Sequence, residues 1–188
     1  MALHIVDSFF DAVLLLQPDI YSDERGFFLE QYRSDYLEYY GISEKIVQEN
    51  HSGSVKNVIR GMHFQWDKPM GKLLRVIRGS IQLVEVDIRY NSPTLGKYCS
   101  MKISDENRQM VWIPPGFANG FAALSDFVEV QYLCTALWNP QAESAIAWND
   151  TDIAIPWEID SPIVSHKDGI AQTLNEWLQK PESRLFSI

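Results

Sequence analysis

The sequence contains few of the residues that build metal centres and disulfide frameworks. Its 188 residues include four histidines and two cysteines. Cys99 and Cys134 lie far apart in apolar stretches, so we expect no disulfide framework and a reducing compartment, the cytoplasm. The first ten residues lack the basic segment and the cleavage site of a signal peptide. No apolar run is long enough to cross a bilayer, so a membrane is not an expected partner.

Basic residues are in the minority. Lysine and arginine number 16 against 25 aspartates and glutamates, and the net charge is -9. Nucleic-acid-binding surfaces are usually strongly basic, so nucleic acid is not an expected partner either. A small anionic ligand remains compatible with this charge, because a pocket can be basic on an acidic protein. The length fits one domain over 1–188 that buries its own core.

Repeats, linkers and low-complexity segments are also missing, and the hydrophobic pattern has mostly a period of two. Residues 72–89 read as two strands joined by a hairpin turn at Gly79. Within the second strand, Gln82 and Glu85 are expected to face solvent, as in a half-buried strand. Further strands are expected at 27–33, 45–54, 98–104, 109–114, 120–124 and 127–138, with helices at 34–41 and 169–180. Many short strands with few helices predict an all-β, double-sheet jelly roll.

A metal centre is not expected in this jelly roll. Metal-binding barrels of this kind supply a His-x-His pair, a carboxylate and a third histidine. Here His63 is followed by Gln65 where the second histidine would stand, and Lys72 and Asn119 occupy the other two positions. A lone imidazole beside a lysine ammonium is a poor site for a divalent cation.

His63 lies in the stretch IRGMHFQW, where it could be a base or a buried histidine without chemical function. Alternation predicts that it faces the same way as Gln65 and away from Met62. Arg60 would face away from His63 unless Gly61 marks a bulge.

Polar residues accumulate on the predicted inner face of the barrel. Lys72 and Tyr132 are expected there together with His63 and Gln65. Burying these groups is costly unless the barrel holds water or a ligand. The pattern therefore favours a polar pocket, with His63 as a base. Of the other histidines, His4 lies near a terminus and His166 in an expected surface turn, which leaves His51 beside His63 as a candidate.

Seven segments, in order, resemble the dTDP-4-dehydrorhamnose 3,5-epimerase family. They match from about residue 20 to 170, and the patterns DERGFF, RGxHxQ and WIPxGFAxGF are specific. The segments are 23–32, 47–65, 71–80, 87–98, 112–126, 132–135 and 146–150. The resemblance implies a cupin-type jelly roll, a homodimer, and a reaction that uses neither metal nor cofactor.

The family chemistry implies roles for four residues. The C4 ketone of a 4-keto-6-deoxy sugar nucleotide acidifies the protons on C3 and C5. The resemblance implies that His63 removes such a proton while Asp168 orients the imidazole. Tyr132 would return a proton to the opposite face of the enolate. Lys72 would face the C4 oxygen, where a fixed cation stabilises the developing charge.

The resemblance also implies a set of substrate-binding residues, some reaching across a dimer. Arg60 and Lys167 would bind the diphosphate, and Trp138 would stack on the base. Arg25 and Glu30 would reach the neighbouring subunit's site through strand exchange, although ordinary surface charge is the alternative for both. The full set is Arg25, Phe28, Glu30, Gln48, Glu49, Asn50, Arg60, Gln65, Asn119, Trp138, Glu143 and Lys167.

One departure from the family pattern leaves the product open. The family usually has histidine in GFAHGF, where this chain has Asn119. Asparagine can donate a neutral hydrogen bond but cannot shuttle a proton. A 3- or 5-monoepimerase, or a ketoisomerase on a GDP- or CDP-linked sugar, heptoses included, is therefore an alternative to the 3,5-epimerase. A non-catalytic sugar-nucleotide-binding cupin and a metal-dependent oxygenase are the alternatives from other classes.

Overall fold

The computed structural model describes residues 2–42 and 45–187, in which the strands form two main sheets and a separate hairpin. The strands are β1 (Leu3–Phe9), β2 (Val13–Pro18), β3 (Ile20–Asp23), β4 (Gly26–Leu29), β5 (Gln48–Val55), β6 (Ile59–Gln65), β7 (Lys72–Arg78), β8 (Ser80–Asp87), β9 (Tyr98–Ser104), β10 (Met110–Ile113), β11 (Phe117–Ala123), β12 (Phe127–Cys134) and β13 (Glu143–Ala145). The short helices are α1 (Ser34–Tyr39), α2 (His166–Gly169), α3 (Leu174–Leu178) and the 3-10 helix η1 (Pro181–Phe186).

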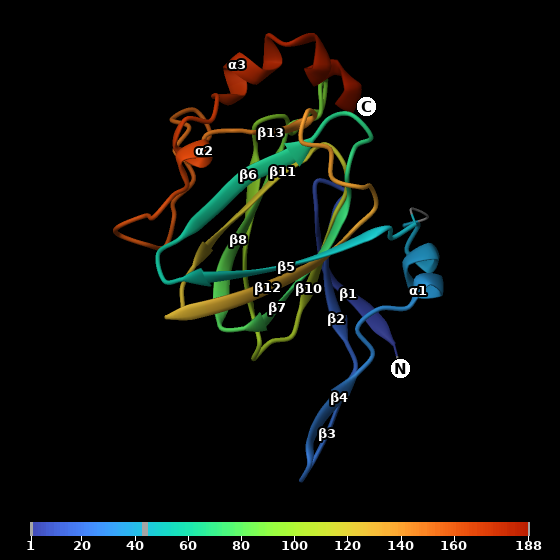
Figure 1. Ribbon diagram of the computed structural model, residues 1–188. Coiled ribbons are helices and arrows are strands. Elements are labelled where there is room, and N and C mark those ends of the chain that lie inside the picture. Colours follow the sequence, from blue (N-terminus) through green and yellow to red (C-terminus); the bar gives the residue numbers. More distant parts are fainter. Residues whose placement is uncertain (1, 43–44, 188) are drawn as a thin grey trace.

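The two sheets form the expected jelly roll. One sheet has the order β1-β2-β10-β7-β12-β5 and the other the order β13-β6-β11-β8-β9, with antiparallel pairing throughout (Figure 1). Apolar side chains of both sheets meet in one core between them, among them Leu74, Leu83, Phe121 and Val130. The all-β prediction is confirmed, and β9 coincides with the expected strand 98–104.

The prediction that residues 72–89 form a hairpin is wrong. β7 and β8 follow one another in the chain but belong to different sheets, because β10 and β12 already occupy both edges of β7. Gly79 turns the chain from one sheet to the other with a φ of 79°. A β-carbon there would lie 2.6 Å from the carbonyl oxygen of Phe127, so the crossing requires glycine.

The half-buried strand predicted after this turn is also wrong. All residues from Ile81 to Asp87 are buried, because the C-terminal segment covers the outer face of β8. Val84 and Val86 pack there with Trp177 of α3 and Phe186 of η1. Figure 1 shows α3 and the C-terminus at the end of the molecule where β6, β11 and β13 lie. The C-terminal helix η1 is thus part of the core.

The single helix predicted for 169–180 is interrupted. The backbone carbonyl of Gln172 accepts a hydrogen bond from Ala147 N, which keeps the chain extended before α3. Thr173 then starts the new helix with a capping box that it forms with Glu176. Other strand boundaries differ from expectation at their ends; β4, for example, stops at Leu29 instead of continuing to 33.

A bulge in β6 decides which way its polar residues face. Asn119 of β11 pairs with His63 and Phe121 pairs with Arg60, so β6 carries one extra residue between these pairs. Gly61 has a φ of 137°, and a β-carbon on it would lie 2.5 Å from the Cα of Gly120. The bulge turns Arg60 to the side on which His63 lies.

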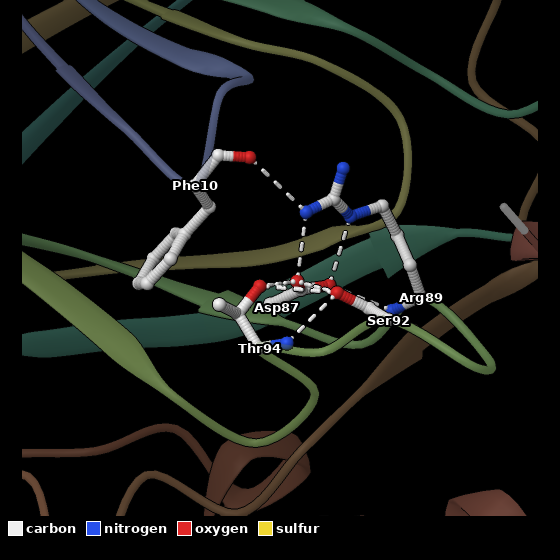
Figure 2. Close-up of polar contacts among 5 residues, drawn as sticks. All are labelled: Phe10, Asp87, Arg89, Ser92 and Thr94. Atoms are coloured by element: carbon white, nitrogen blue, oxygen red, sulfur yellow. Dashed lines mark hydrogen bonds and ion pairs between the residues drawn. The ribbon is translucent and has the colours of Figure 1, made fainter.

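A buried carboxylate anchors the loop between β8 and β9. Asp87 accepts hydrogen bonds from the backbone and guanidinium of Arg89 and from the hydroxyls of Ser92 and Thr94 (Figure 2). Arg89 also donates to the carbonyl of Phe10, at the turn between β1 and β2. Burial by itself would raise the pKa of Asp87, but these hydrogen bonds outweigh it and lower the pKa.

The hairpin of β3 and β4 projects from the sheets (Figure 1). It carries the large apolar side chains of Tyr21, Phe27 and Phe28, each at least half exposed. Among the described residues, the helices are all too short or too polar to cross a membrane.

Candidate active site

A small cleft opens between the two sheets, at the end where β6, β7 and β12 come together. His63 enters it from one sheet, and Tyr132 enters from the other. Lys72 lies on β7, next to β12 in the ladder, and its ammonium is 5.8 Å from the centre of the Tyr132 ring. The other lining residues are Gln48, Asn50, Phe64, Gln65, Met70, Trp138 and Glu143.

His63 is held by a carboxylate from a distant part of the chain. Its Nε2 lies 2.6 Å from Oδ1 of Asp168 in α2, and only 5% of the Asp168 side chain is exposed. Burial acts to raise the pKa of Asp168, but the hydrogen bond and charge of His63 outweigh it, so the pKa is lowered. An ionised carboxylate only accepts hydrogen bonds, so Nε2 carries the proton and Nδ1 keeps a free lone pair. Ser165, which caps α2, fixes the backbone of Asp168.

Tyr132 faces His63 from the opposite wall. Burial raises the pKa of its phenol, while a hydrogen bond with Asn50 lowers it, and the net direction is upward. The hydroxyl therefore keeps its proton at neutral pH. Tyr132 lies on the inner face of β12 together with Val130 and Val128, two and four positions before it, as the period of two predicts.

Lys72 also faces inward, on the same face of β7 as Leu74. Its ammonium donates a 3.2 Å hydrogen bond to Oδ1 of Asn119, and Nδ2 of Asn119 donates a 2.7 Å hydrogen bond to Oε1 of Glu85. Burial lowers the pKa of Lys72, and the charge of Glu85 opposes that effect. Asn119 lies behind Lys72, with its amide engaged on both sides.

The rim of the cleft carries a polar network. Oε2 of Glu143 accepts hydrogen bonds from Nζ of Lys167 at 2.6 Å and from Nε1 of Trp138 at 3.2 Å. Burial would raise the pKa of Glu143, but Lys167 and Trp138 lower it. The side chain of Gln48 accepts from the backbone of Trp138 and donates to Asn50. The indole itself is more than half exposed.

Three other expected binding residues, Arg60, Glu49 and Gln65, are each held by hydrogen bonds. Arg60 donates to the Ser54 hydroxyl and to the Gly53 carbonyl, both in β5. Glu49 points to the outer face of β5, where it accepts from Gln131, whereas its neighbours Gln48 and Asn50 line the cleft. Gln65 donates to the carbonyls of Lys68 and Leu137 and accepts from the backbone of Asn139, so its amide ties two loops together.

Three expected binding residues lie away from the cleft of their own chain. Phe28 lies in β4 of the projecting hairpin. Arg25, in the turn of that hairpin, forms an ion pair with Asp23. Glu30 follows β4 and pairs with Arg33 at 3.5 Å.

Sequence reasoning missed Glu85, which it placed on the solvent face. The sequence did contain the signal for its position. Glu85 stands two positions after Leu83 and four after Ile81, so strand alternation puts all three on the inner face. Phe64 and Met70 were also missed as lining residues. Among residues 2–42 and 45–187, no group of three or more His, Cys, Asp or Glu side chains could hold a metal ion.

Comparison with known proteins now decides the family. The family description dTDP-4-dehydrorhamnose 3,5-epimerase matches residues 8–176. The chain belongs to this family. It is an epimerase, an enzyme of the isomerase class. A curated dTDP-4-dehydrorhamnose 3,5-epimerase from Methanothermobacter thermautotrophicus is 46% identical over 169 residues, which cover 88% of this chain and 91% of the relative.

Solved structures of the family share the fold. A dTDP-6-deoxy-D-glucose-3,5-epimerase from Legionella pneumophila, in complex with dTDP-4-keto-L-rhamnose, is 40% identical with a TM-score of 0.90, and the match covers 93% of this chain and 94% of that one. A 3′-monoepimerase from Streptomyces bikiniensis, in complex with dTDP-quinovose, is 28% identical with a TM-score of 0.84, covering 94% and 89%. The family scaffold therefore carries more than one epimerase specificity.

Proposed function

We propose that this epimerase inverts C3 and C5 of a dTDP-4-keto-6-deoxyhexose, the conversion that leads to dTDP-4-dehydrorhamnose. One observation carries the proposal: His63 and Tyr132 enter one cleft from opposite sheets, and Lys72 lines the same cleft with its ammonium 5.8 Å from the Tyr132 ring. A base and an acid on opposite walls suit a reaction that removes a proton from one face of a carbon and returns it to the other. The names of the relatives support the choice of substrate.

His63 is proposed as the base, acting through Nδ1. The contact of Nε2 with Asp168 leaves Nδ1 as the nitrogen with a free lone pair. Nδ1 takes the proton on the carbon next to the ketone, and the electron pair of the C–H bond moves to the C4 oxygen to form an enolate. Asp168 stabilises the imidazolium that forms and keeps the ring oriented.

Tyr132 is proposed as the acid and Lys72 as the oxyanion stabiliser. Tyr132 gives its phenolic proton to the opposite face of the same carbon, which restores the ketone with inverted configuration. Lys72 offers a buried positive charge to the C4 oxygen while the enolate exists. A fixed charge of this kind is typically worth a few kcal/mol in the transition state. Proton exchange with solvent then restores His63 and Tyr132.

The rim residues are proposed to bind the nucleotide. Trp138 presents an exposed indole face on which thymine can stack. Arg60, bonded to β5, and Lys167, paired with Glu143 of the cleft, would offer cations to the diphosphate. Lys167 already pairs with Glu143, so the carboxylate keeps the ammonium at the rim.

We further propose that the active enzyme is a homodimer with composite sites. The β3–β4 hairpin projects from its own subunit and exposes three large aromatic side chains, which favours burial against a second copy (Figure 1). In such a dimer, Arg25 and Phe28 of the hairpin and the adjacent Glu30 reach the partner's cleft.

Deuterium incorporation tests the function. The enzyme is incubated with dTDP-4-keto-6-deoxyglucose in D2O, and label at C3 and C5 is followed by NMR. We expect label at both carbons with wild type and at neither with His63→Ala. Wild-type enzyme without incorporation at either carbon would overturn the proposal, including its nucleotide assignment.

A monoepimerase is the second candidate, because one observation favours it. Asn119 uses its oxygen on Lys72 and one amide hydrogen on Glu85. Asn119 also does not line the cleft, so no charge or exchangeable acid stands where the family usually has histidine. Label at one carbon only would establish this alternative.

A further inference from the structure

Glu85 is a buried carboxyl group to which the proposed reaction assigns no step. It lies on β8, its side chain is inaccessible to solvent, and it points into the barrel. Oε1 accepts the hydrogen bond from Asn119, while Oε2 has no hydrogen-bond partner in the part of the chain that the structure describes. An incompletely satisfied buried carboxyl is costly, so its presence needs a reason.

Asn119 connects Glu85 to the cleft. In the sheet, Asn119 of β11 pairs with His63 on one side and with Glu85 on the other. An ammonium only donates, so Lys72 must face Oδ1 of the amide, which leaves Nδ2 to donate to Glu85. Each contact therefore orients the next one, from Glu85 through Asn119 to Lys72.

We propose that Glu85 is a positioning residue for the epimerisation: through Asn119 it holds the Lys72 ammonium in the cleft and keeps it positively charged. This inference rests on the proposed function, in which Lys72 faces the C4 oxygen. Glu85 does not touch the substrate in this proposal, because it acts one residue behind the cation.

The charges around Lys72 support the second part of the proposal. The titratable groups that face it are Glu85 of β8, Cys134 and Tyr132 of β12, Glu143 of β13 and His63 of β6. Burial lowers the pKa of Lys72, and Glu85 has the strongest opposing charge. Burial raises the pKa of Glu85 well above its ordinary value, and the charge of Lys72 and the hydrogen bond from Asn119 oppose that shift only in part. Each of the two groups opposes the shift of the other, so the charged forms of Glu85 and Lys72 stabilise one another.

Two substitutions distinguish the effect of the Glu85 charge from the effect of the position of its carboxyl group. Glu85→Gln keeps the size and an oxygen acceptor for Asn119 but removes the charge. Glu85→Asp keeps the charge but is too short to keep the 2.7 Å contact. Glu106→Gln, at an exposed glutamate in the turn after β9, is the matched control. For each protein we would measure kcat, KM, the pH dependence of kcat/KM, and the titration of the Lys72 ammonium by 15N NMR in the free enzyme.

For Glu85→Gln we expect kcat to fall about tenfold while KM stays within about threefold. The alkaline limb of the pH profile and the Lys72 titration should both move to lower pH, by about one unit. Tyr132 also titrates on the alkaline side, and the NMR signal distinguishes the two groups. Glu85→Asp should lose about threefold to tenfold in kcat with the alkaline limb in place. The Glu106 control should match wild type.

The proposal is overturned if Glu85→Gln retains the wild-type pH profile and Lys72 titration, even with a lower melting temperature, since that result means a purely structural role. If Glu85→Gln does not fold, Glu85→Asp decides, and a wild-type kcat there would overturn the positioning role. A wild-type enzyme without activity would sink the proposed function instead, and the NMR titration would still test Glu85.

Discussion

Nε2 of His63 lies 2.6 Å from Oδ1 of Asp168, although 105 positions separate the two residues in the chain. The first belongs to a strand of the barrel, and the second to a four-residue helix outside it. This contact selects Nδ1 as the basic nitrogen and supplies a negative charge for the imidazolium. Asp168 should therefore matter for the rate more than for binding.

Asp168→Asn tests this contact. We expect kcat to fall by at least about 100-fold, because the amide cannot stabilise the imidazolium and can reverse the tautomer. KM should stay within about threefold of wild type, since Asp168 lies behind His63. Steady-state kinetics measures both values, with Asp160→Asn, at an exposed aspartate, as the control. A rise in KM at unchanged kcat would show instead that Asp168 serves binding.

Tyr132→Phe separates the two halves of the reaction. Removing the phenol takes away the acid but leaves His63 and Asp168 in place, so inversion should suffer more than the first proton removal. Deuterium wash-in without inversion, followed by NMR, is the expected signature. Tyr98→Phe, in β9 and away from the cleft, should behave as wild type. Equal loss of exchange and inversion would contradict the assigned role.

Arg25→Ala and His63→Ala together test the composite site. Each variant alone should be nearly inactive if Arg25 reaches the partner's cleft. When the two are unfolded and refolded together, half of the dimers are mixed, and each mixed dimer has one site without either substitution. Activity should return to about a quarter of wild type by this count. Mixtures that stay as inactive as the separate variants would show that Arg25 does not act across the dimer.

Asp87→Asn tests the loop anchor drawn in Figure 2. The amide accepts fewer hydrogen bonds than the carboxylate and leaves the partly buried Arg89 without its counter-charge. We expect the free energy of unfolding at pH 7 to fall by about 2–4 kcal/mol. Urea denaturation would measure it, with the exposed Asp126→Asn as the control.

The same variant should show a distinct pH dependence. The pKa of Asp87 is lowered in the folded state, so its stabilising effect is complete above the ordinary value of 3.8. The effect declines as the pH falls through the lower, folded-state pKa, where the carboxylate gains a proton. The difference between wild type and Asp87→Asn should therefore shrink below about pH 4. A difference that stays constant from pH 7 to pH 3 would mean that the ionised carboxylate is not what stabilises the loop.

Local pattern accounts for much of the fold and for the cleft-lining core of the site. Alternation in IRGMHFQW placed His63 and Gln65 on one face and Met62 on the other, and the structure has this arrangement. Tyr132 was also expected on the inner face, whereas alternation left Lys72 either inside or at the rim of its strand, and both residues line the cleft. These positions follow from sequence because the side chains of a strand alternate whatever the strand pairs with.

Pairing and coverage depend on the whole molecule. Whether β7 pairs with β8 depends on which strands already occupy its edges, and no local pattern records that. Whether Gln82 is buried depends on a C-terminal segment that lies about 75 to 100 residues further along the chain and covers the outer face of β8. Sequence proximity therefore predicted a hairpin and a solvated face that the structure does not have.

The sequence by itself determined the residue types, the inward faces of the strands and, through its motifs, the family. The tertiary structure decided which of those residues meet: His63 with Asp168, and Lys72 with Asn119 and Glu85. The physical reason is the separation along the chain of the residues that each feature involves. Alternation is a property of neighbouring residues, whereas a hydrogen bond near 3 Å between distant segments requires both sheets and the covering helices to be in place.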